Sequence, residues 1–253
     1  MTNITWNAEG YRDAFAFVTS FGAAAMDLLS APEGSLVVDL GCGNGRLTPE
    51  LAARGYRALG VDDSPEMLEV ARRDYPGLEF RRGNALSFEL DEPADAIFSN
   101  SMLHWVEDGL QDELLAHIAS QIHSGGEFVF ECGGKRCGKA VHDALAVRFA
   151  AHGLEYRMPF YFPTIGEYAP RLEAAGFEVT HAFHFDRPSA QQGPDGIRTS
   201  IEMFDMAPFE GMDPQLKDQI IDEATEYLRP VLQTPDGTWY VDYVRLRMRC
   251  VRK

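Results

Sequence analysis

From residue 36 onward, short apolar runs alternate with longer segments whose apolar positions recur at helical spacing. Five of the apolar runs are read as strands, at 36–40, 57–62, 78–83, 94–100 and 126–131. Helices are expected at 47–55, 64–75 and about 108–122, and the second of these opens with Ser64 and Pro65, a pair typical of a helix start. Strands that alternate with helices predict a parallel sheet with right-handed crossovers.

Beyond residue 131 the alternation becomes looser. Helical stretches are expected at about 138–152, 196–206 and 214–229, and further strands at 176–186 and 238–251. We therefore expect a single domain over 1–253 with a doubly wound, mostly parallel α/β fold. Its core sheet is assigned to about 34–132, 176–186 and 238–251. Its helical cap is assigned to 1–30, 133–168 and 187–237.

Charge and hydropathy narrow the classes of partner. The 253 residues include 23 Lys and Arg and 39 Asp and Glu, for a formal net charge of −16. Because such a surface repels phosphate polyanions, no nucleic-acid partner is expected. No stretch approaches the ~20 uninterrupted apolar residues of a membrane span, and the N-terminal residues lack the pattern of a secretion signal. These features predict a soluble, cytoplasmic protein without a membrane partner.

The cysteines, histidines and C-terminal arginines suggest structural roles. The four cysteines, at 42, 132, 137 and 250, have no C-x-x-C spacing, so reduced thiols and no metal site are expected. His181 and His184 are three residues apart in an expected strand and would point to opposite faces. Near the C-terminus, arginines alternate with apolar residues, which predicts a strand with one solvent-exposed face; these are Arg245, Arg247 and Arg249.

The stretch VVDLGCGNGRL concentrates glycine where the first strand passes into a helix. Gly41, Gly43 and Gly45 carry no Cβ, so a ligand can lie against bare backbone there. A dinucleotide fingerprint, G-x-G-x-x-G, would require a glycine at the position of Arg46. Asp39 would also oppose an anionic pyrophosphate, whereas it suits a ligand that carries positive charge. The loop therefore favours a cationic nucleoside over a dinucleotide.

Two polar residues follow the next strands. Asp62 ends the second strand about twenty residues after the glycines, where an acidic side chain can accept hydrogen bonds from ribose hydroxyls. Asn84 follows the third strand and could hydrogen-bond an adenine edge. Asparagine is equally typical of a turn, so this second assignment remains open on local grounds.

Four stretches, VVDLGCGNGRL, GVDDSPEMLEVAR, RRGNAL and DAIFSNSMLHWVED, together resemble the class I S-adenosylmethionine-dependent methyltransferases. Within that class the sequence is similar to the small-molecule group that includes trans-aconitate methyltransferase. The resemblance covers about residues 5–132 and, more loosely, the last two strands. It implies a Rossmann-like sheet of seven strands, with the last strand antiparallel between the fifth and sixth. It also implies S-adenosylmethionine as cofactor, S-adenosylhomocysteine as product and a small-molecule acceptor.

The resemblance also assigns cofactor contacts. It implies that Gly41 and neighbouring backbone contact the methionyl part and that Asp62 contacts the ribose. Asn84 and Ala85 would lie at the adenine, and Asn100 near the amino-acid end. The residues assigned to the cofactor on this basis are Tyr11, Asp39, Gly41, Gly43, Asn44, Asp62, Asp63, Met67, Asn84, Ala85, Asn100 and Ser101. The family usually has aspartate where Asn84 stands, although an asparagine carbonyl can still accept from the adenine amino group.

Methyl transfer from a sulfonium is an in-line displacement, so the main task of the protein is to position the reactants. A carboxylate acceptor is already ionised and needs no base, whereas an amine, phenol or carbon acid benefits from one. SNSM (99–102) stands where enzymes that methylate DNA bases or protein glutamine carry an Asn/Asp-Pro-Pro-Tyr motif, which argues against those substrates. We expect O-methylation of a carboxylate or hydroxyl. His104 is the nearest candidate base, with simple packing as its alternative.

Several residues are candidates for closing the site and holding the acceptor. Tyr11, on an expected N-terminal helix, is the candidate lid residue, although amphipathic packing would explain it equally. Trp105 could wall the cofactor pocket or pack at the core edge. Arginines in the expected cap could bind a carboxylate or remain solvated; they are Arg136, Arg157 and Arg187. Nearby aromatic residues suit a flat or apolar acceptor or a packed cap; they are Tyr156, Phe160, Tyr161 and Phe162.

Two other functions compete with this interpretation. A catalytically idle protein could bind S-adenosylmethionine and regulate a partner, because binding residues do not establish chemistry. An NAD-dependent oxidoreductase would also use a glycine loop at the end of a strand, but Arg46 and Asp39 count against it.

Overall fold

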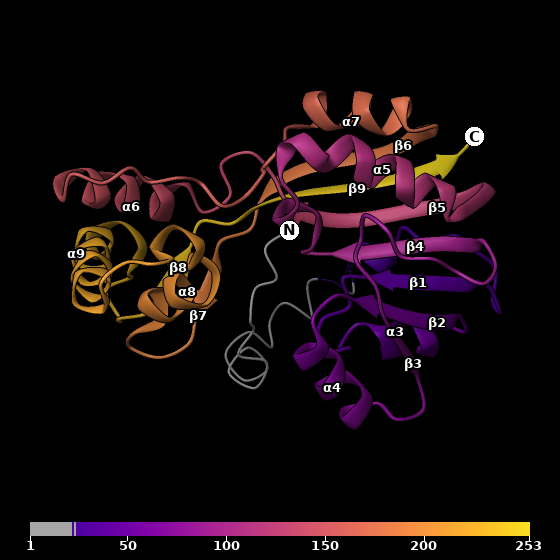
Figure 1. Ribbon diagram of the computed structural model, residues 1–253, viewed down its shortest axis with the longest axis horizontal. Coiled ribbons are helices and arrows are strands. Elements are labelled where there is room, and N and C mark those ends of the chain that lie inside the picture. Colours follow the sequence, from indigo (N-terminus) through magenta and orange to yellow (C-terminus); the bar gives the residue numbers. More distant parts are fainter. Residues whose placement is uncertain (1–21, 23) are drawn as a thin grey trace.

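The computed structural model describes residues 22 and 24–253, so Tyr11 and the predicted N-terminal lid helix lie outside the described residues. A seven-stranded sheet has the order β3-β2-β1-β4-β5-β9-β6 (Figure 1). Its strands are β1 (Leu36–Leu40), β2 (Arg57–Asp62), β3 (Glu79–Arg82), β4 (Ala94–Asn100), β5 (Ile122–Gly133), β6 (Phe177–Asp186) and β9 (Val244–Arg252). β9 runs antiparallel to both β5 and β6, and the other pairs are parallel. The predicted α/β fold and the position of its antiparallel strand are confirmed.

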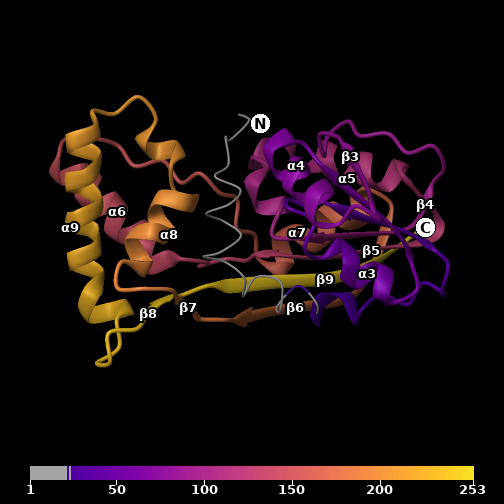
Figure 2. The same ribbon diagram turned by 90° about the horizontal axis from the view of Figure 1, so that it is seen from below.

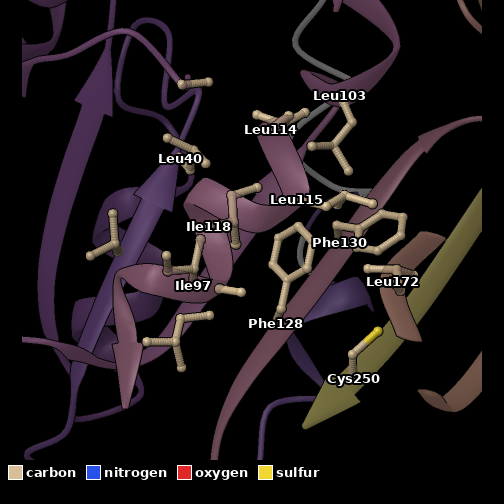
Figure 3. Close-up of a cluster of buried hydrophobic side chains, with 14 of the residues drawn as sticks. Leu40, Ile97, Leu103, Leu114, Leu115, Ile118, Phe128, Phe130, Leu172 and Cys250 are labelled. Atoms are coloured by element: carbon tan, nitrogen blue, oxygen red, sulfur yellow. The ribbon is translucent and has the colours of Figure 1, made fainter. Parts of the chain in front are cut away.

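Helices cover both faces of the sheet. On one face, Leu51 of α3 (Thr48–Ala53) packs with Val37 and Phe98 of the sheet, and α4 (Pro65–Asp74) lies on the same side against Phe80. The other face carries α5 (Gln111–Ser120), preceded by the short turns η1 (Leu103–Trp105) and η2 (Asp108–Leu110), together with α7 (Ile165–Ala174). Figure 3 shows Leu115 and Ile118 of α5 packed toward Ile97 and Phe128 of the sheet. The central strands β1 and β4 are buried on both faces, which explains the apolar runs from which the sequence predicts them.

The start signal of α4 operates as its sequence predicts. Ser64 is the N-cap, its Oγ accepts from the backbone N–H of Met67 at 3.2 Å, and Pro65 occupies the first turn. α7 is a helix that the sequence did not predict, because aromatic residues and prolines obscure its periodicity. Its N-terminus nevertheless has a capping box, formed by Thr164 and Glu167.

A second apolar core lies beyond the end of the sheet (Figures 1 and 2). It is formed by α6 (Lys139–Ala151), α8 (Gly196–Phe204), α9 (Pro214–Leu232) and a small sheet of β7 (Ser189–Gln191) and β8 (Trp239–Val241), with the short turn η3 (Ala207–Phe209). Phe149, Ile201, Ile221 and Trp239 are among its fully buried members. We call this group of elements the cap. No helix of the described part of the chain is long and apolar enough to cross a membrane.

The predicted last strand, 238–251, is two strands with different partners. β8 pairs with β7 in the cap, whereas β9 pairs with β5 and β6 in the main sheet. Asp242 lies between them, and its Oδ2 accepts from the backbone N–H of Ala140 at 2.9 Å, at the start of α6. The chain therefore passes from the cap into the sheet at residues 242–243.

The prediction that one face of β9 is exposed to solvent is wrong. Arg245 is only 6% exposed, and the next two arginines on its face form ion pairs with the neighbouring strand. Arg247 donates to Glu131 at 2.7 Å and Arg249 donates to Glu127 at 2.6 Å. The register of β5 and β9 puts these opposite charges on one face, and residues 24–30 contribute hydrogen bonds above them. A strand with charges on one face can thus be buried when its neighbour supplies the counter-charges.

Candidate functional site

A cavity of about 340 Å³ lies between the carboxyl edge of the sheet and the cap. This is where a ligand crevice is expected in an open α/β sheet. The predicted site residues that line it are Asp39, Gly41, Gly43, Asn44, Asp62, Asp63, Met67, Ala85, Asn100, Ser101 and His104. Asn84 is not among the lining residues. The cavity continues from these residues to side chains of the cap, among them His142 and Asp205.

The glycine loop presents bare backbone to this cavity. Gly41 and Gly43 have φ angles of +75° and +55°, a region that residues with a Cβ rarely adopt. A Cβ on Gly41 would approach the side chain of Met102 to 2.5 Å, whereas a Cβ on Gly43 would meet no atom of the described residues within 4 Å. Gly43 therefore faces open space, and a ligand can lie directly against its backbone.

Asp62 holds the loop to the start of α4. Its Oδ2 accepts from the backbone N–H of Gly43 at 2.8 Å, and its Oδ1 accepts from that of Ser64 at 2.9 Å. Burial is the main reason why the pKa of this carboxyl is raised. Each oxygen has a further lone pair, so the carboxylate can also accept from ligand hydroxyls in the cavity.

Asp39 is buried near the end of β1, two residues before the glycine loop. It is 1% exposed, and its Oδ2 accepts from the hydroxyl of Thr48 at 2.8 Å, which ties β1 to the start of α3. Burial, followed by the nearby charge of Asp62, raises the pKa of Asp39 to about 7.

Both the amide nitrogen and the amide oxygen of Asn84 form hydrogen bonds within the protein. Its Nδ2 donates to Asp63 Oδ2 at 3.0 Å, and its Oδ1 accepts from the backbone N–H of Leu86 at 3.0 Å. The neighbouring Ala85 lines the cavity. The adenine contact of Asn84 stays a prediction, whereas its role in fixing the turn after β3 is visible in these bonds.

Two buried side-chain amide atoms of residues that line the cavity have no hydrogen-bond partner among the described residues. They are Nδ2 of Asn44 and Oδ1 of Asn100. Because buried polar groups are nearly always paired in folded proteins, such atoms indicate a ligand with complementary groups. The Asn100 oxygen requires a donor such as an ammonium group, and the Asn44 amide requires an acceptor such as a carboxylate. Together with the open backbone at Gly43, they fit a nucleoside that carries an amino acid.

His104 is held as a neutral ring. The backbone N–H of Gly133 donates to its Nδ1 at 3.2 Å, so the neutral ring carries its proton on Nε2. Burial, followed by the charge of Arg245, lowers the pKa of His104 to about 3. The ring lies among aromatic side chains, with centroids 5.8 Å from Trp105 and 5.6 Å from Phe162. His104 thus offers an N–H donor to the cavity, and it is a poor proton acceptor.

Arg245 is a functional candidate that the sequence pattern did not indicate. Three guanidinium groups surround one fully buried carboxylate, Glu131: Arg187 at 2.6 Å, Arg247 at 2.7 Å and Arg245 at 3.9 Å. Arg245 lines the cavity, and its buried Nε has no hydrogen-bond partner in the described part of the chain. One feature of the sequence could have indicated this role: β5 contains two acidic residues, Glu127 and Glu131, whose charges a neighbouring strand must neutralise if they are buried.

The arginines predicted to hold an acceptor lie elsewhere. Arg136 lies 3.6 Å from Asp186, and Arg157 lies 3.1 Å from Glu155, both with more than half of their side chains exposed. Arg187 is buried beside Glu131, where burial is the main reason that its pKa falls to about 10. None of the three lines the cavity.

Comparisons with known proteins agree with this geometry. Residues 37–126 match the family model described as a methyltransferase domain. The chain is 27% identical over 252 residues to an uncharacterized methyltransferase of Schizosaccharomyces pombe, with 96% of each protein covered. It is 38% identical over 128 residues to a trans-aconitate 2-methyltransferase of Methylobacterium nodulans, which covers 48% of this chain and 47% of that protein.

The fold also matches solved structures. A candidate methyltransferase from Bacillus halodurans aligns over 92% of this chain and 98% of its own, with a TM-score of 0.63 and 15% identity. The matched domain runs from β1 into β5 and so contains the glycine loop, Asp62 and His104. The chain therefore carries a methyltransferase domain similar to those of the class I S-adenosylmethionine-dependent methyltransferases, and about half of its length is similar to trans-aconitate 2-methyltransferases.

Proposed function

We propose that this enzyme methylates an oxygen of a small organic acid, most directly a carboxylate oxygen. S-adenosylmethionine, when bound, supplies a methyl group on a positively charged sulfur. The residues of this chain must then bind the acid, orient one oxygen toward that methyl group and keep water out. The observation that carries the proposal is the position of Arg245 in the wall of the cavity.

Arg245 makes a long contact with its counter-charge. It lies 3.9 Å from Glu131, whose carboxylate is contacted more closely by Arg187 at 2.6 Å and Arg247 at 2.7 Å. Its other neighbour is the ring of Tyr243, 5.1 Å from the guanidinium carbon. Buried charges in proteins are normally paired, and a planar guanidinium is suited to a carboxylate. An acid in the cavity would supply a closer negative charge.

His104 supports an acceptor that needs no base. Its Nδ1 already accepts from Gly133, and its pKa of about 3 keeps the ring neutral at physiological pH. A group that is ionised before it binds, such as a carboxylate, requires no proton removal. The N–H on Nε2 can instead donate to an acceptor oxygen and fix its orientation, which is the main source of rate for an in-line displacement.

The aromatic wall of the cavity would exclude water and contact the carbon skeleton of the acid. Trp105 and Phe160 lie edge to face at 4.7 Å, and Phe160 stacks on Phe162 at 5.3 Å. All three residues line the cavity. Flat or apolar segments suit such surfaces. The net charge of −16 further favours a free small molecule over a nucleic acid as the acceptor.

The relatives give independent support. The trans-aconitate 2-methyltransferases act, by name, on an organic acid, and their similarity to this chain covers about half of their length. Because that similarity covers only part of each chain, the acid accepted here is proposed from Arg245 and His104 and not transferred from those relatives.

The proposal is tested by measuring transfer of label from methyl-labelled S-adenosylmethionine to a panel of acids. Each acid is paired with its primary amide and its alcohol. We expect labelled product from acids and none from the amides, and we expect Arg245→Gln to raise KM for acids by about 10-fold or more. Arg249→Gln is the matched control, since Arg249 shares the face of β9 but does not line the cavity. Transfer to the alcohols or amides in preference to the acids would refute the proposal.

A further inference from the structure

The cap contributes a buried carboxylate to the cavity, far in sequence from the glycine loop. Asp205 follows α8, is 5% exposed and lines the cavity. Its Oδ1 is buried and has no hydrogen-bond partner among residues 24–253. Burial raises the pKa of this carboxyl to about 7. A carboxylate without donors in a buried site is costly, unless a ligand supplies the donor.

The neighbouring His142 does not satisfy Asp205. Nδ1 of His142 lies 3.5 Å from Asp205 Oδ1, but it lies only 2.7 Å from the hydroxyl oxygen of Tyr156. Burial raises the pKa of Tyr156, so its phenol keeps its proton. Burial also lowers the pKa of His142 to about 4, so this ring stays neutral. Nδ1 therefore pairs with Tyr156, and Asp205 Oδ1 receives no hydrogen bond from His142 in the described structure.

Asp205 and Arg245 are separate polar groups of one cavity. Tyr243 lies between them: its ring lies under the guanidinium of Arg245, and its hydroxyl is hydrogen-bonded to Ser200 of α8, the helix that precedes Asp205. Both Ser200 and Tyr243 line the cavity as well. A ligand can thus meet a positive group at the edge of the sheet and a negative group in the cap.

We infer that Asp205 is a specificity-determining residue that accepts a hydrogen bond from a hydroxyl or ammonium group of the acceptor. The acceptor is then an acid with two functional groups: a carboxylate toward Arg245 and a hydrogen-bond donor toward Asp205. This inference rests on the proposed function, because that function identifies the carboxylate end. It distinguishes this enzyme from one that takes acids whose polar groups are all carboxylates, since a second carboxylate would meet Asp205 with the same sign of charge.

Binding to the protein saturated with S-adenosylhomocysteine tests the inference without any methyl transfer. The probes are hexanoate and its ω-hydroxy and ω-amino derivatives, with the corresponding butanoates as a shorter series, titrated by calorimetry. We expect one of the substituted acids to bind at least about 10-fold more tightly than the plain acid of equal length, because a buried acceptor discriminates strongly against ligands without a donor. The two substituents separate a hydroxyl donor from an ammonium donor.

Asp205→Asn keeps the size of the side chain and removes its charge. We expect it to remove the preference for the ω-amino acid and to reduce that for the ω-hydroxy acid, while affinity for the plain acid changes less than about 2-fold. Asp242→Asn is the matched control, because Asp242 is a partly buried carboxylate near the cap whose side chain accepts from Ala140 and does not line the cavity. It should leave all affinities unchanged.

The inference is overturned if the wild-type protein shows no preference for substituted acids at either length, or if Asp205→Asn leaves the preference unchanged. These results differ from failure of the proposed function. An Asp205-dependent preference without ester formation would refute the function and keep the binding site. Methylation of plain acids without any such preference would keep the function and refute the role of Asp205.

Discussion

His104 and Gly133 are joined by a hydrogen bond in which the backbone N–H of Gly133 donates to Nδ1 of the imidazole across 3.2 Å. This bond connects the turn after β4 to the end of β5, the two strand ends that border the cavity. It fixes the tautomer of the ring, because the nitrogen that accepts cannot also carry the proton. The orientation of His104 is thus set by backbone, and its remaining N–H is available to a ligand.

The first prediction concerns the pH dependence of the reaction. Because burial lowers the pKa of His104 to about 3, the ring does not titrate in the usual working range, and kcat should be flat between about pH 5.5 and 8 as far as His104 is concerned. His104→Gln, whose amide can still donate, should retain more activity than His104→Ala, which we expect to lose about 10- to 100-fold. A loss of rate below pH 6.5 that disappears in His104→Gln would show instead that His104 is a base.

The second prediction separates backbone strain from ligand contact at the glycine loop. Gly43 and Gly34 both have positive φ, and in both positions an added Cβ would meet no atom within 4 Å in the part of the chain that the structure describes. Alanine at either site should cost about 1–2 kcal/mol of unfolding free energy, measured by urea denaturation. Only Gly43→Ala should weaken S-adenosylhomocysteine binding, by about 10-fold or more, because its methyl group enters the cavity. Equal affinities in the two variants would contradict the assignment of this loop to the cofactor.

The third prediction concerns the ribose contact. Asp62→Ala removes both acceptors of the Gly43 and Ser64 N–H groups together with the acceptor for ligand hydroxyls. We expect a loss of about 100-fold in S-adenosylhomocysteine affinity by calorimetry, and a smaller loss in Asp62→Asn, which keeps one acceptor oxygen. Circular dichroism controls for folding of both variants. If Asp62→Ala binds as tightly as the wild type, the ribose assignment is wrong.

The fourth prediction links the cap carboxylate to stability. The pKa of Asp205 is about 7 in the folded protein and about 4 for an ordinary aspartate, so folding favours the protonated form. Its contribution to stability is therefore present below about pH 4 and is lost as pH rises through about 7. Asp205→Asn should gain stability over the wild type at about pH 8, by up to about 4 kcal/mol, and little at about pH 4.

Urea unfolding of both proteins at several pH values measures this difference. Asp39 has a pKa raised to a similar value, so part of the pH dependence should persist in Asp205→Asn. If Asp205→Asn is more stable and yet binds acceptors less well, Asp205 behaves as a functional residue that lowers the stability of the fold. Equal stability of the two proteins at about pH 8 would contradict the burial of a charged carboxylate in the cap.

The sheet could be predicted because its signals are local. Each buried strand is a short apolar run, and Ser64 with Pro65 marks the start of α4 without reference to the rest of the chain. The glycine loop and Asp62 were also predictable, since only the spacing of a strand, a turn and a helix is needed. Most predicted site residues come together in the cavity for this reason.

What the sequence did not indicate depends on contacts between distant segments. Arg245 and Arg247 form the pattern of an exposed strand face, until β5 supplies Glu131 more than a hundred residues away in sequence. Asp205 lies in a stretch with no motif, and only the packing of α8 beside Tyr243 brings it to the cavity. Likewise, the side chain of Asn84 is of a type that can contact adenine, but in the structure it is hydrogen-bonded to Asp63 and Leu86. These bonds depend on how the turn after β3 packs, which the local sequence does not indicate.

Treatment of the labelled product with mild alkali tests the central claim most directly. Methyl esters are cleaved by hydroxide to the acid and methanol, whereas methyl ethers and methylated amines are stable under these conditions. With methyl-labelled S-adenosylmethionine and an accepted acid, the account predicts that the label is released as volatile methanol, and that Arg245→Gln lowers the yield. Label that stays on the acceptor after alkali, or transfer that is indifferent to Arg245, would contradict it.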